Sequence, residues 1–175
     1  MRAYALAKLI QVAGGVDART RLQKCIFLLQ EAGLDFGASY SLHYYGPYSR
    51  DVAETTDRLA QADILEETMA SHQLGERYSY RVTSSGAGLL DAVETSPEEK
   101  KALEAMNPFF DLINRLGSEP LRNLELAATM VFFHRHGPFD WETAKARTAK
   151  FKNENEEAAL SQAEKLAREL LHELQ

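Results

Sequence analysis

The histidines and the single cysteine are the residues of this 175-residue chain best able to bind a metal or to act as nucleophiles. No histidine has a carboxylate at the spacing of a His-Glu-x-x-His metal-binding helix. Cys25 lies among Leu22, Ile26 and Leu29, which is typical of a small core residue rather than a reactive thiol. The histidines are His43, His72, His134, His136 and His172. The pattern predicts no metal site and no cofactor.

Two further kinds of catalytic motif are missing from the sequence. Gly86-Ala87-Gly88 lacks the additional glycine and the strand-to-helix context of a phosphate-binding loop. No serine lies in a nucleophile elbow. We therefore expect a protein that is not an enzyme and has no catalytic residues. A catalytic set assembled from residues distant in sequence is the alternative.

Molecular recognition is the chemistry indicated by residues 42–50, which read Leu-His-Tyr-Tyr-Gly-Pro-Tyr-Ser-Arg. Tyrosine is enriched at binding hot spots, so this cluster predicts a surface that binds a protein partner. The predicted partner-binding residues are Tyr44, Tyr45, Tyr48 and Arg50. The alternative is that these rings, together with Tyr40, form a packed lid over the neighbouring helices.

Basic residues indicate a second kind of recognition, contact with the phosphates of a nucleic acid. In that interpretation the helix after Ser49 enters the major groove of DNA. Asp51, Glu54 and Asp57 on the same helix would repel phosphate, so we expect protein contacts to dominate. The candidate nucleic-acid contacts are Arg19, Arg21, Lys24, Arg50, Thr55, Arg58 and Arg77. A further basic set is Lys145, Arg147, Lys150 and Lys152.

Charge is unevenly distributed along the chain. The formal net charge of -6 argues against indiscriminate attraction to phosphate. Residues 1–30 hold five bases and one acid, residues 49–125 hold fifteen acids and eight bases, and residues 135–152 hold five bases and two acids. The basic surface is therefore expected near the start and near the end of the sequence.

Two helices precede the aromatic segment and must position it. Apolar residues recur at helical spacing from Leu6 to Ala13, and Gly14-Gly15 ends this helix. A second helix is predicted from about Ala18 to Ala32, with Gly33 at its C-terminal cap. The two helices are expected to pair.

The aromatic segment joins the second helix to a third. Residues 37–45 alternate loosely and are expected to extend against a sheet. Gly46-Pro47 is expected to interrupt strand structure, because proline has no amide hydrogen. Ser49 then caps a helix that buries Val52 and ends near Ala62.

A β-hairpin follows the third helix. Residues 64–67 form its first strand, and the alternating Tyr78, Tyr80 and Val82 form its second, with a polar tip at residues 71–75. A hairpin in this position corresponds to the wing of a winged helix-turn-helix domain. That architecture serves both DNA and protein partners.

The remainder of the sequence is predicted to be helical. Thr83 or Ser84, then Ser96 and Asp140, are predicted N-terminal caps, with Pro97 in a first helical turn. Apolar stripes follow at Leu121, Leu124, Ala128 and Val131, and at Leu160, Ala163, Ala167, Leu170 and Leu174. The last stripe is expected to pack onto the chain's own core, and a homodimer seam is the alternative.

The paired motifs resemble those of a known family. Leu22-Gln23-Lys24 begins a hydrophobic helix, Tyr45-Gly46-Pro47-Tyr48-Ser49 follows, and the third helix ends at Arg58-Leu59 before the hairpin and Thr83-Ser84-Ser85-Gly86. This arrangement resembles the YwgA-like proteins over roughly residues 3–93. It is more distantly similar to the Panacea (SocA-like) antitoxin domain, which also joins a Leu-Gln-Lys helix to a Tyr-Gly-Pro turn. The resemblance implies a winged-helix-like core and a regulator or antitoxin that acts through protein contacts.

Together these patterns predict a mostly helical α+β fold. Residues 1–95 are expected to form a winged-helix-like domain with a small β-hairpin wing, and residues 96–175 a C-terminal helical extension packed on it. Apolar runs such as Ala127–Phe133 are far shorter than the roughly 20 residues of a membrane span, so we expect a cytoplasmic protein. The expected function is a non-catalytic regulatory binding module of the antitoxin or adaptor type. A dimeric winged-helix transcriptional regulator that binds DNA is the alternative.

Overall fold

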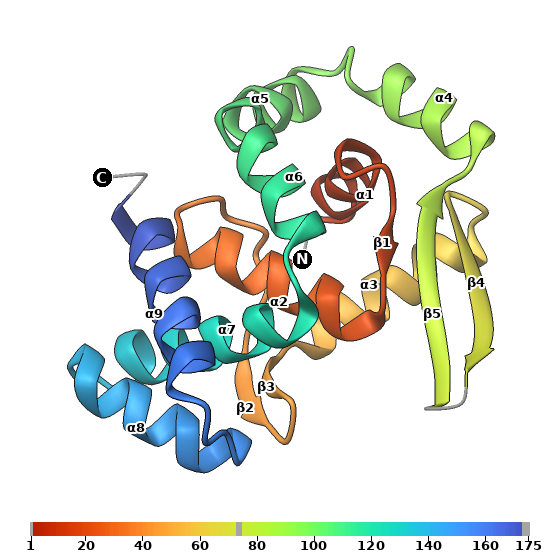
Figure 1. Ribbon diagram of the computed structural model, residues 1–175. Coiled ribbons are helices and arrows are strands. Elements are labelled where there is room, and N and C mark those ends of the chain that lie inside the picture. Colours follow the sequence, from red (N-terminus) through yellow and green to blue (C-terminus); the bar gives the residue numbers. More distant parts are fainter. Residues whose placement is uncertain (1, 73–74, 173–175) are drawn as a thin grey trace.

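The computed structural model describes residues 2–72 and 75–172 (Figure 1). The first half contains α1 (Ala3–Val12), β1 (Val16–Asp17), α2 (Arg19–Glu31), β2 (Ser41–His43), β3 (Gly46–Tyr48), α3 (Arg50–Gln61), β4 (Leu65–His72) and β5 (Gly75–Val82). The second half contains α4 (Ser84–Val93), α5 (Pro97–Met106), the 3-10 turn η1 (Asn107–Phe109), α6 (Phe110–Ser118), α7 (Leu121–His136), α8 (Trp141–Lys152) and α9 (Glu157–His172). The predicted mostly helical α+β class is confirmed.

Helix boundaries follow the capping residues that the sequence indicates. Ser49 Oγ accepts a hydrogen bond from the Val52 amide at 3.3 Å, and Asp140 Oδ1 accepts one from the Thr143 amide at 2.7 Å. Thr83 and Ser96 cap α4 and α5 in the same way. These side chains satisfy amide groups that have no partner inside the helix, and the predicted caps are confirmed.

The strands form two separate antiparallel sheets. In the first, β5 lies between β1 and β4, with Val16 opposite Tyr80 and Leu65 opposite Val82. This confirms the predicted hairpin, but its strands are longer than predicted, because Ser71, His72 and Gly75 of the predicted tip belong to the strands; Gln73 and Leu74 lie outside the described residues. The second sheet consists of β2 and β3 alone.

The β2–β3 hairpin corrects two predictions. The segment at residues 37–45 was expected to extend against the main sheet, but its strand β2 pairs with β3. Gly46-Pro47 was expected to interrupt strand structure, but Pro47 lies within β3, opposite Leu42. A proline is tolerated there because β3 has a neighbour on one side only, so its missing amide hydrogen need not serve a second strand.

The core is formed by residues from both halves of the chain, and α7 lies at the centre of the second half. Helix α7 packs against α2, α8 and α9 (Figure 1). The predicted stripe of α9 is buried within the chain at Leu160, Ala163, Ala167 and Leu170, whereas Leu174 lies outside the described residues. These side chains pack onto the chain's own core.

Two smaller expectations concern Cys25 and the membrane. Cys25 is buried on α2, as predicted for a core residue, and burial raises the pKa of its thiol. Within the described ranges, every helix is too short or too polar to cross a lipid bilayer.

Candidate functional site

Gln23 of α2 fastens the junction between β3 and α3. Its Nε2 donates a hydrogen bond to the Ser49 carbonyl oxygen at 2.9 Å, and its Oε1 accepts one from the Ser49 amide at 2.9 Å. Both residues are buried. The side-chain amide, which carries a donor and an acceptor, thereby satisfies both backbone groups of one residue. Ser49 is in turn the cap of α3, so Gln23 sets where the hairpin ends and the helix begins.

Lys24 holds the same hairpin one residue further along α2. Its Nζ donates to the Pro47 carbonyl oxygen at 2.7 Å, and the residue is only 1% exposed. Gly46 lies over Lys24 and α7, with φ at +92°, and an added Cβ would lie 2.5 Å from Thr129 Oγ1. Only glycine fits this backbone and this space. The Leu-Gln-Lys and Tyr-Gly-Pro motifs are therefore two sides of one contact.

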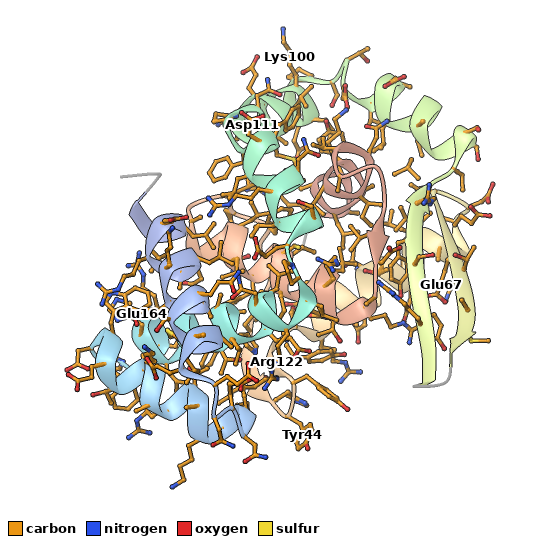
Figure 2. The ribbon with its side chains drawn as sticks, viewed as in Figure 1. Tyr44, Glu67, Lys100, Asp111, Arg122 and Glu164 are labelled. Atoms are coloured by element: carbon orange, nitrogen blue, oxygen red, sulfur yellow. The ribbon has the colours of Figure 1, made fainter. Side chains whose placement is uncertain are left out.

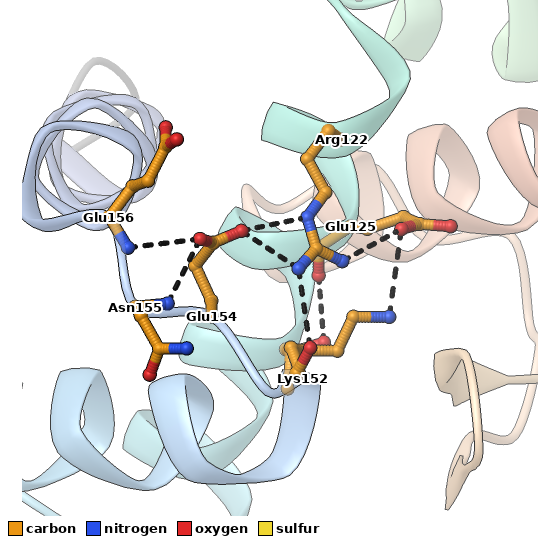
Figure 3. A network of polar contacts seen from close by, with 7 residues as sticks. Arg122, Glu125, Lys152, Glu154, Asn155 and Glu156 are labelled. Carbon is orange, nitrogen blue, oxygen red and sulfur yellow. Dashed lines mark hydrogen bonds and ion pairs between the residues drawn. The ribbon is translucent and has the colours of Figure 1, made fainter.

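A network of charges surrounds the buried lysine. Burial lowers the pKa of Lys24 to about 8; the positive charge of Lys152 also lowers it, and Glu125 opposes the change. Glu125 Oε2 lies 3.6 Å from Lys152 Nζ and 3.6 Å from Arg122 Nη1, and Figure 3 marks both contacts. Arg122 also donates to Glu154 from Nε at 3.0 Å and from Nη2 at 2.8 Å. These contacts join α7 to the end of α8 and to the segment before α9.

The hairpin tip presents its tyrosines to solvent. Tyr44 is 83% exposed, Tyr45 63% and Tyr48 36%, and Figure 2 shows Tyr44 at the tip of the hairpin. The rings of Tyr44 and Tyr45 meet edge to face with centroids 5.1 Å apart. Tyr40 differs, because it packs edge-on against Phe27. A packed lid therefore describes Tyr40 but not the two tip residues.

A pocket of about 500 Å³ lies between the hairpin, α2 and α3. The hairpin supplies four aromatic rings, α3 supplies one face, and Tyr80 of β5 also reaches the lining. The hairpin and α3 residues are His43, Tyr44, Tyr45, Tyr48, Val52, Ala53, Thr56 and Asp57. The α2 residues are Arg19, Thr20, Leu22, Gln23 and Lys24. Its size is that of pockets which accept a small ligand or a few side chains.

The charged side chains of the pocket are differently engaged. Arg19 donates to Tyr80 Oη at 2.8 Å and to Glu67 Oε2 at 3.0 Å, and its guanidinium lies 3.8 Å from the Tyr78 ring centroid. Burial raises the pKa of the Tyr80 phenol, and its hydrogen bond to Glu67 raises it further. The Asp57 side chain is exposed and forms no ion pair or hydrogen bond with any other residue in the described ranges. It is the unmatched charge of the pocket.

Three positions of the predicted nucleic-acid surface are buried or engaged within the fold. Lys24 and Thr55 are both 1% exposed, so they offer almost no surface to a nucleic acid. Thr55 belongs to the inner face of α3, and Lys24 turns inward to reach the hairpin carbonyl. Arg21 donates to the carbonyl oxygens of Leu116 at 3.5 Å and Glu119 at 2.5 Å, at the end of α6. Cations are stabilised at a helix C-terminus, which accounts for this position.

The other candidates remain at the surface but lie close to acids or hydroxyl groups. Arg50 Nε lies 2.6 Å from Glu54 Oε1. Arg58 Nη2 donates to Thr55 Oγ1 at 3.0 Å, and Arg77 Nη2 lies 3.9 Å from Asp17 Oδ2. Arg50 is near the predicted tyrosines in sequence, but its ion pair is with α3 and it does not line the pocket.

The further basic set on α8 is similarly engaged. Lys145 forms ion pairs with Glu157 and, at 3.5 Å, with Glu164, and Arg147 lies 3.9 Å above the centroid of the Phe139 ring. Lys152 belongs to the network of Figure 3. Lys145, Arg147 and Lys152 are thus held in internal contacts, whereas Lys150 is exposed.

The histidines of α7 complete the helix end and do not converge. His134 Nδ1 lies 2.7 Å from the Phe139 carbonyl oxygen, and His136 Nε2 lies 2.8 Å from Glu31 Oε1. His43 lies apart from both, in the pocket. Across the part of the chain that the structure describes, no three His, Cys, Asp or Glu side chains are grouped as metal ligands.

Sequence reasoning missed Gln23, Asp57 and Thr129 as parts of this site. Gln23 is a polar residue inside the apolar run of α2, which is a usable signal, since a buried amide requires partners. Asp57 was considered only as a charge that repels DNA. Thr129 carries no signal, because its role depends on packing between α7 and a hairpin more than 80 residues earlier.

Comparison with known proteins identifies one relevant similarity. No protein-family model matches the chain. The chain is 28% identical over 167 residues to the uncharacterized protein YwgA of Bacillus subtilis (strain 168). The alignment covers 92% of this chain and 93% of that protein. The similarity to YwgA therefore extends through the C-terminal helices as well, beyond the roughly 90 residues that carry the motifs.

Proposed function

We propose that the chain is a non-catalytic regulatory binding module, antitoxin-like or adaptor-like, that acts mainly through contacts with a protein partner. Its first 95 residues would be a winged-helix-like domain, distantly related to the Panacea domain. The order α1, β1, α2, α3, β4, β5, in which the β2–β3 hairpin is inserted between α2 and α3, supports this, as does the placement of β5 between β1 and β4. In this proposal the β4–β5 hairpin is the wing.

The exposed tyrosines of the β2–β3 hairpin are the observation that carries the proposal. Large aromatic side chains held in solvent by a fixed backbone lose little conformational freedom when a partner covers them. Gln23 and Lys24 provide that fixation from α2. Tyr44 and Tyr45 therefore have the exposure and the rigid support expected of hot-spot residues.

DNA binding remains the second candidate, because the proposed winged-helix order is shared by many DNA-binding domains. The charge arrangement supports it less. Of the basic candidates, Lys24 is buried, Arg21 is bound to the end of α6, and Arg50 is paired with Glu54. Phosphate contact requires accessible cations that displace the counterions condensed on the nucleic acid, and these three are otherwise engaged.

Site-specific photocrosslinking tests the protein-binding proposal. A benzoylphenylalanine placed at Tyr44 or Tyr45 in the native host is expected to yield a discrete adduct with one protein. The same probe at Leu89, an exposed apolar residue of α4, is the matched control. The captured protein, once purified, should bind the unmodified chain, and Tyr44→Ala with Tyr45→Ala should weaken that binding at least about tenfold.

Two results would contradict the proposal. One is the same adducts from positions 44 and 89, since the hairpin would then have no special affinity. The other is tight binding of the purified chain to duplex DNA at low salt with a steep loss at high salt, which would favour the DNA-binding alternative.

A further inference from the structure

We propose that the pocket beneath the tyrosines receives a cationic side chain, an arginine or a lysine, from the protein partner. This inference rests on the proposed function and specifies the chemistry of the residue that the partner inserts. It draws on three features of the pocket: its aromatic rings, its unmatched carboxylate and the engagement of its own cations.

The aromatic rings favour a cation over a neutral or anionic group. His43, Tyr44, Tyr45 and Tyr48 line one end of the pocket. Among the described residues, the hydroxyl groups of the three tyrosines form no hydrogen bond, so the rings are held by the hairpin backbone and by each other. The negative face of a tyrosine ring attracts a guanidinium or ammonium group placed over it.

Asp57 supplies a full negative charge on the α3 wall. It lies one turn after Ala53, and both residues line the pocket from the same face of the helix. The small Ala53 side chain leaves space beside the carboxylate. An arginine that crosses the aromatic end could therefore stack on a ring and pair with Asp57, which would use both halves of its amphipathic side chain.

The cations already present in the pocket do not match Asp57. Arg19 is paired with Glu67 and covered on one face by Tyr78. Lys24 is buried, its ammonium donates to Pro47, and Glu125 lies near enough to oppose the fall in its pKa. The chain as a whole carries a formal net charge of -6, so long-range attraction also favours a basic partner.

The experiment uses blocked tripeptides in which glycines flank a central arginine, lysine, glutamine or glutamate. Binding to the full-length chain is followed by NMR through the backbone amide shifts of Ala53 and Asp57. The arginine and lysine peptides should bind, and the glutamine and glutamate peptides should bind at least about fivefold more weakly. Preference for the glutamate peptide would overturn the inference and indicate an anion-binding pocket at Arg19.

Variants locate the contacts. Asp57→Asn should weaken the arginine peptide about fivefold, whereas Glu54→Gln, an acid on the same helix outside the pocket, should not. Tyr45→Leu should weaken it about threefold and Tyr45→Phe should restore it, because the ring face and not the hydroxyl binds the cation. Equal binding by all four variants would overturn the assignment.

Failure of this inference is distinguishable from failure of the proposed function. If the crosslinks from Tyr44 identify a partner but no cationic peptide binds, the binding module stands and its partner inserts a different group. If the cationic peptides bind but positions 44 and 45 give no adduct, the pocket chemistry stands and the protein-binding function fails.

Discussion

Gln23 is the residue on which the position of the tyrosines most directly depends. Its side chain forms hydrogen bonds with the buried amide and the buried carbonyl oxygen of Ser49. A buried donor or acceptor that loses its partner is more costly than the hydrogen bond itself is stabilising. The contribution of Gln23 is therefore larger than that of an ordinary helix-surface glutamine.

Gln23→Ala is expected to lower the free energy of unfolding by about 1–3 kcal/mol, because the buried Ser49 amide loses its partner and the Ser49 carbonyl oxygen keeps only the hydrogen bond from the Ala53 amide at 3.4 Å. Gln162→Ala on the exposed face of α9 is the control and should change it by less than about 0.5 kcal/mol. Urea denaturation measures both. Equal effects of the two substitutions would contradict the role of Gln23.

Lys24 gives the stability of the protein a distinct pH dependence. Its folded pKa is about 8, below its usual 10.5, so between these values the unfolded chain binds the additional proton. Stability therefore rises with pH in this window, and below pH 8 the full cost of burying the charge is present. The free energy of unfolding of the wild type, relative to Lys24→Met, should increase by roughly 1–3 kcal/mol from pH 7 to pH 10.

Denaturation curves at several pH values measure the free energy of unfolding of the wild type and of Lys24→Met. The difference between the two values removes the effect of the tyrosines, which titrate in both proteins. Lys100→Met, at an exposed lysine of α5, is the control, and its free energy of unfolding should change with pH in parallel with that of the wild type. A Lys24→Met curve that also ran parallel would show that the buried ammonium titrates normally.

At this scale the sequence predicted exposed residues better than buried polar ones. Tyr44 and Tyr45 were recognised as a surface from their clustering. Lys24 was assigned to a different exposed surface, the candidate nucleic-acid contact, because a lysine on an amphipathic helix is usually solvated. The residues around Lys24 in the sequence do not show that its ammonium group is buried and donates to the carbonyl oxygen of Pro47, 23 residues later.

The β2–β3 hairpin is the element whose geometry is most constrained. Gly46 combines a left-handed φ with contact against α7, and the two effects can be separated by substitution. At Gly33 the φ is +108°, but no atom lies within 4 Å of an added Cβ. A substitution at Gly33 therefore tests backbone strain alone. A substitution at Gly46 tests backbone strain together with the steric clash against Thr129 of α7.

Gly46→Ala should lower the free energy of unfolding by roughly 3 kcal/mol, and Gly33→Ala by roughly 1 kcal/mol. Adding Thr129→Ala to Gly46→Ala should recover part of the loss, since it removes the oxygen that lies 2.5 Å from the new Cβ. Thermal or urea unfolding measures all three. Additive losses in the double variant would mean that the collision is not the cause.

Helices whose first turn follows a capping residue were predictable from the sequence. A strand that is defined by its pairing with another strand was not. Ser49, Thr83, Ser96 and Asp140 mark helix starts because a cap acts on amides two or three residues away. The strand that contains Pro47 was missed, because its pairing and its open edge are properties of the hairpin as a whole.

The whole molecule is organised around α7, which contacts α2 on one side and α8 and α9 on others. Leu170 of α9 is fully buried in this packing. Leu170→Ala should lower the free energy of unfolding by about 2–5 kcal/mol, because it removes core contacts and leaves a cavity.

Lys165→Ala, at an exposed position of the same helix, is the matched control and should be nearly neutral. Sizing in solution should give the same oligomeric state for the wild type and both variants. A smaller species formed by Leu170→Ala without loss of stability would return the α9 stripe to a subunit interface.

The class of the fold followed from periodicity, since helical and alternating apolar patterns are properties of each segment. The arrangement of the C-terminal helices on α2 did not follow. It depends on which of several similar apolar stripes face one another, and on a charge network whose members come from α7, α8 and the segment before α9.

The contact of Gln23 and Lys24 with the hairpin limits which substitutions this sequence can accept during evolution. A change to Gly46 leaves a collision with Thr129 of α7 beside Lys24, and a change to Gln23 without a change at the hairpin leaves the buried Ser49 amide without its partner. Neither side can drift alone. The two short segments should therefore be retained or lost as a unit in descendants of this sequence, while the tyrosines that they support remain free to follow a changing partner.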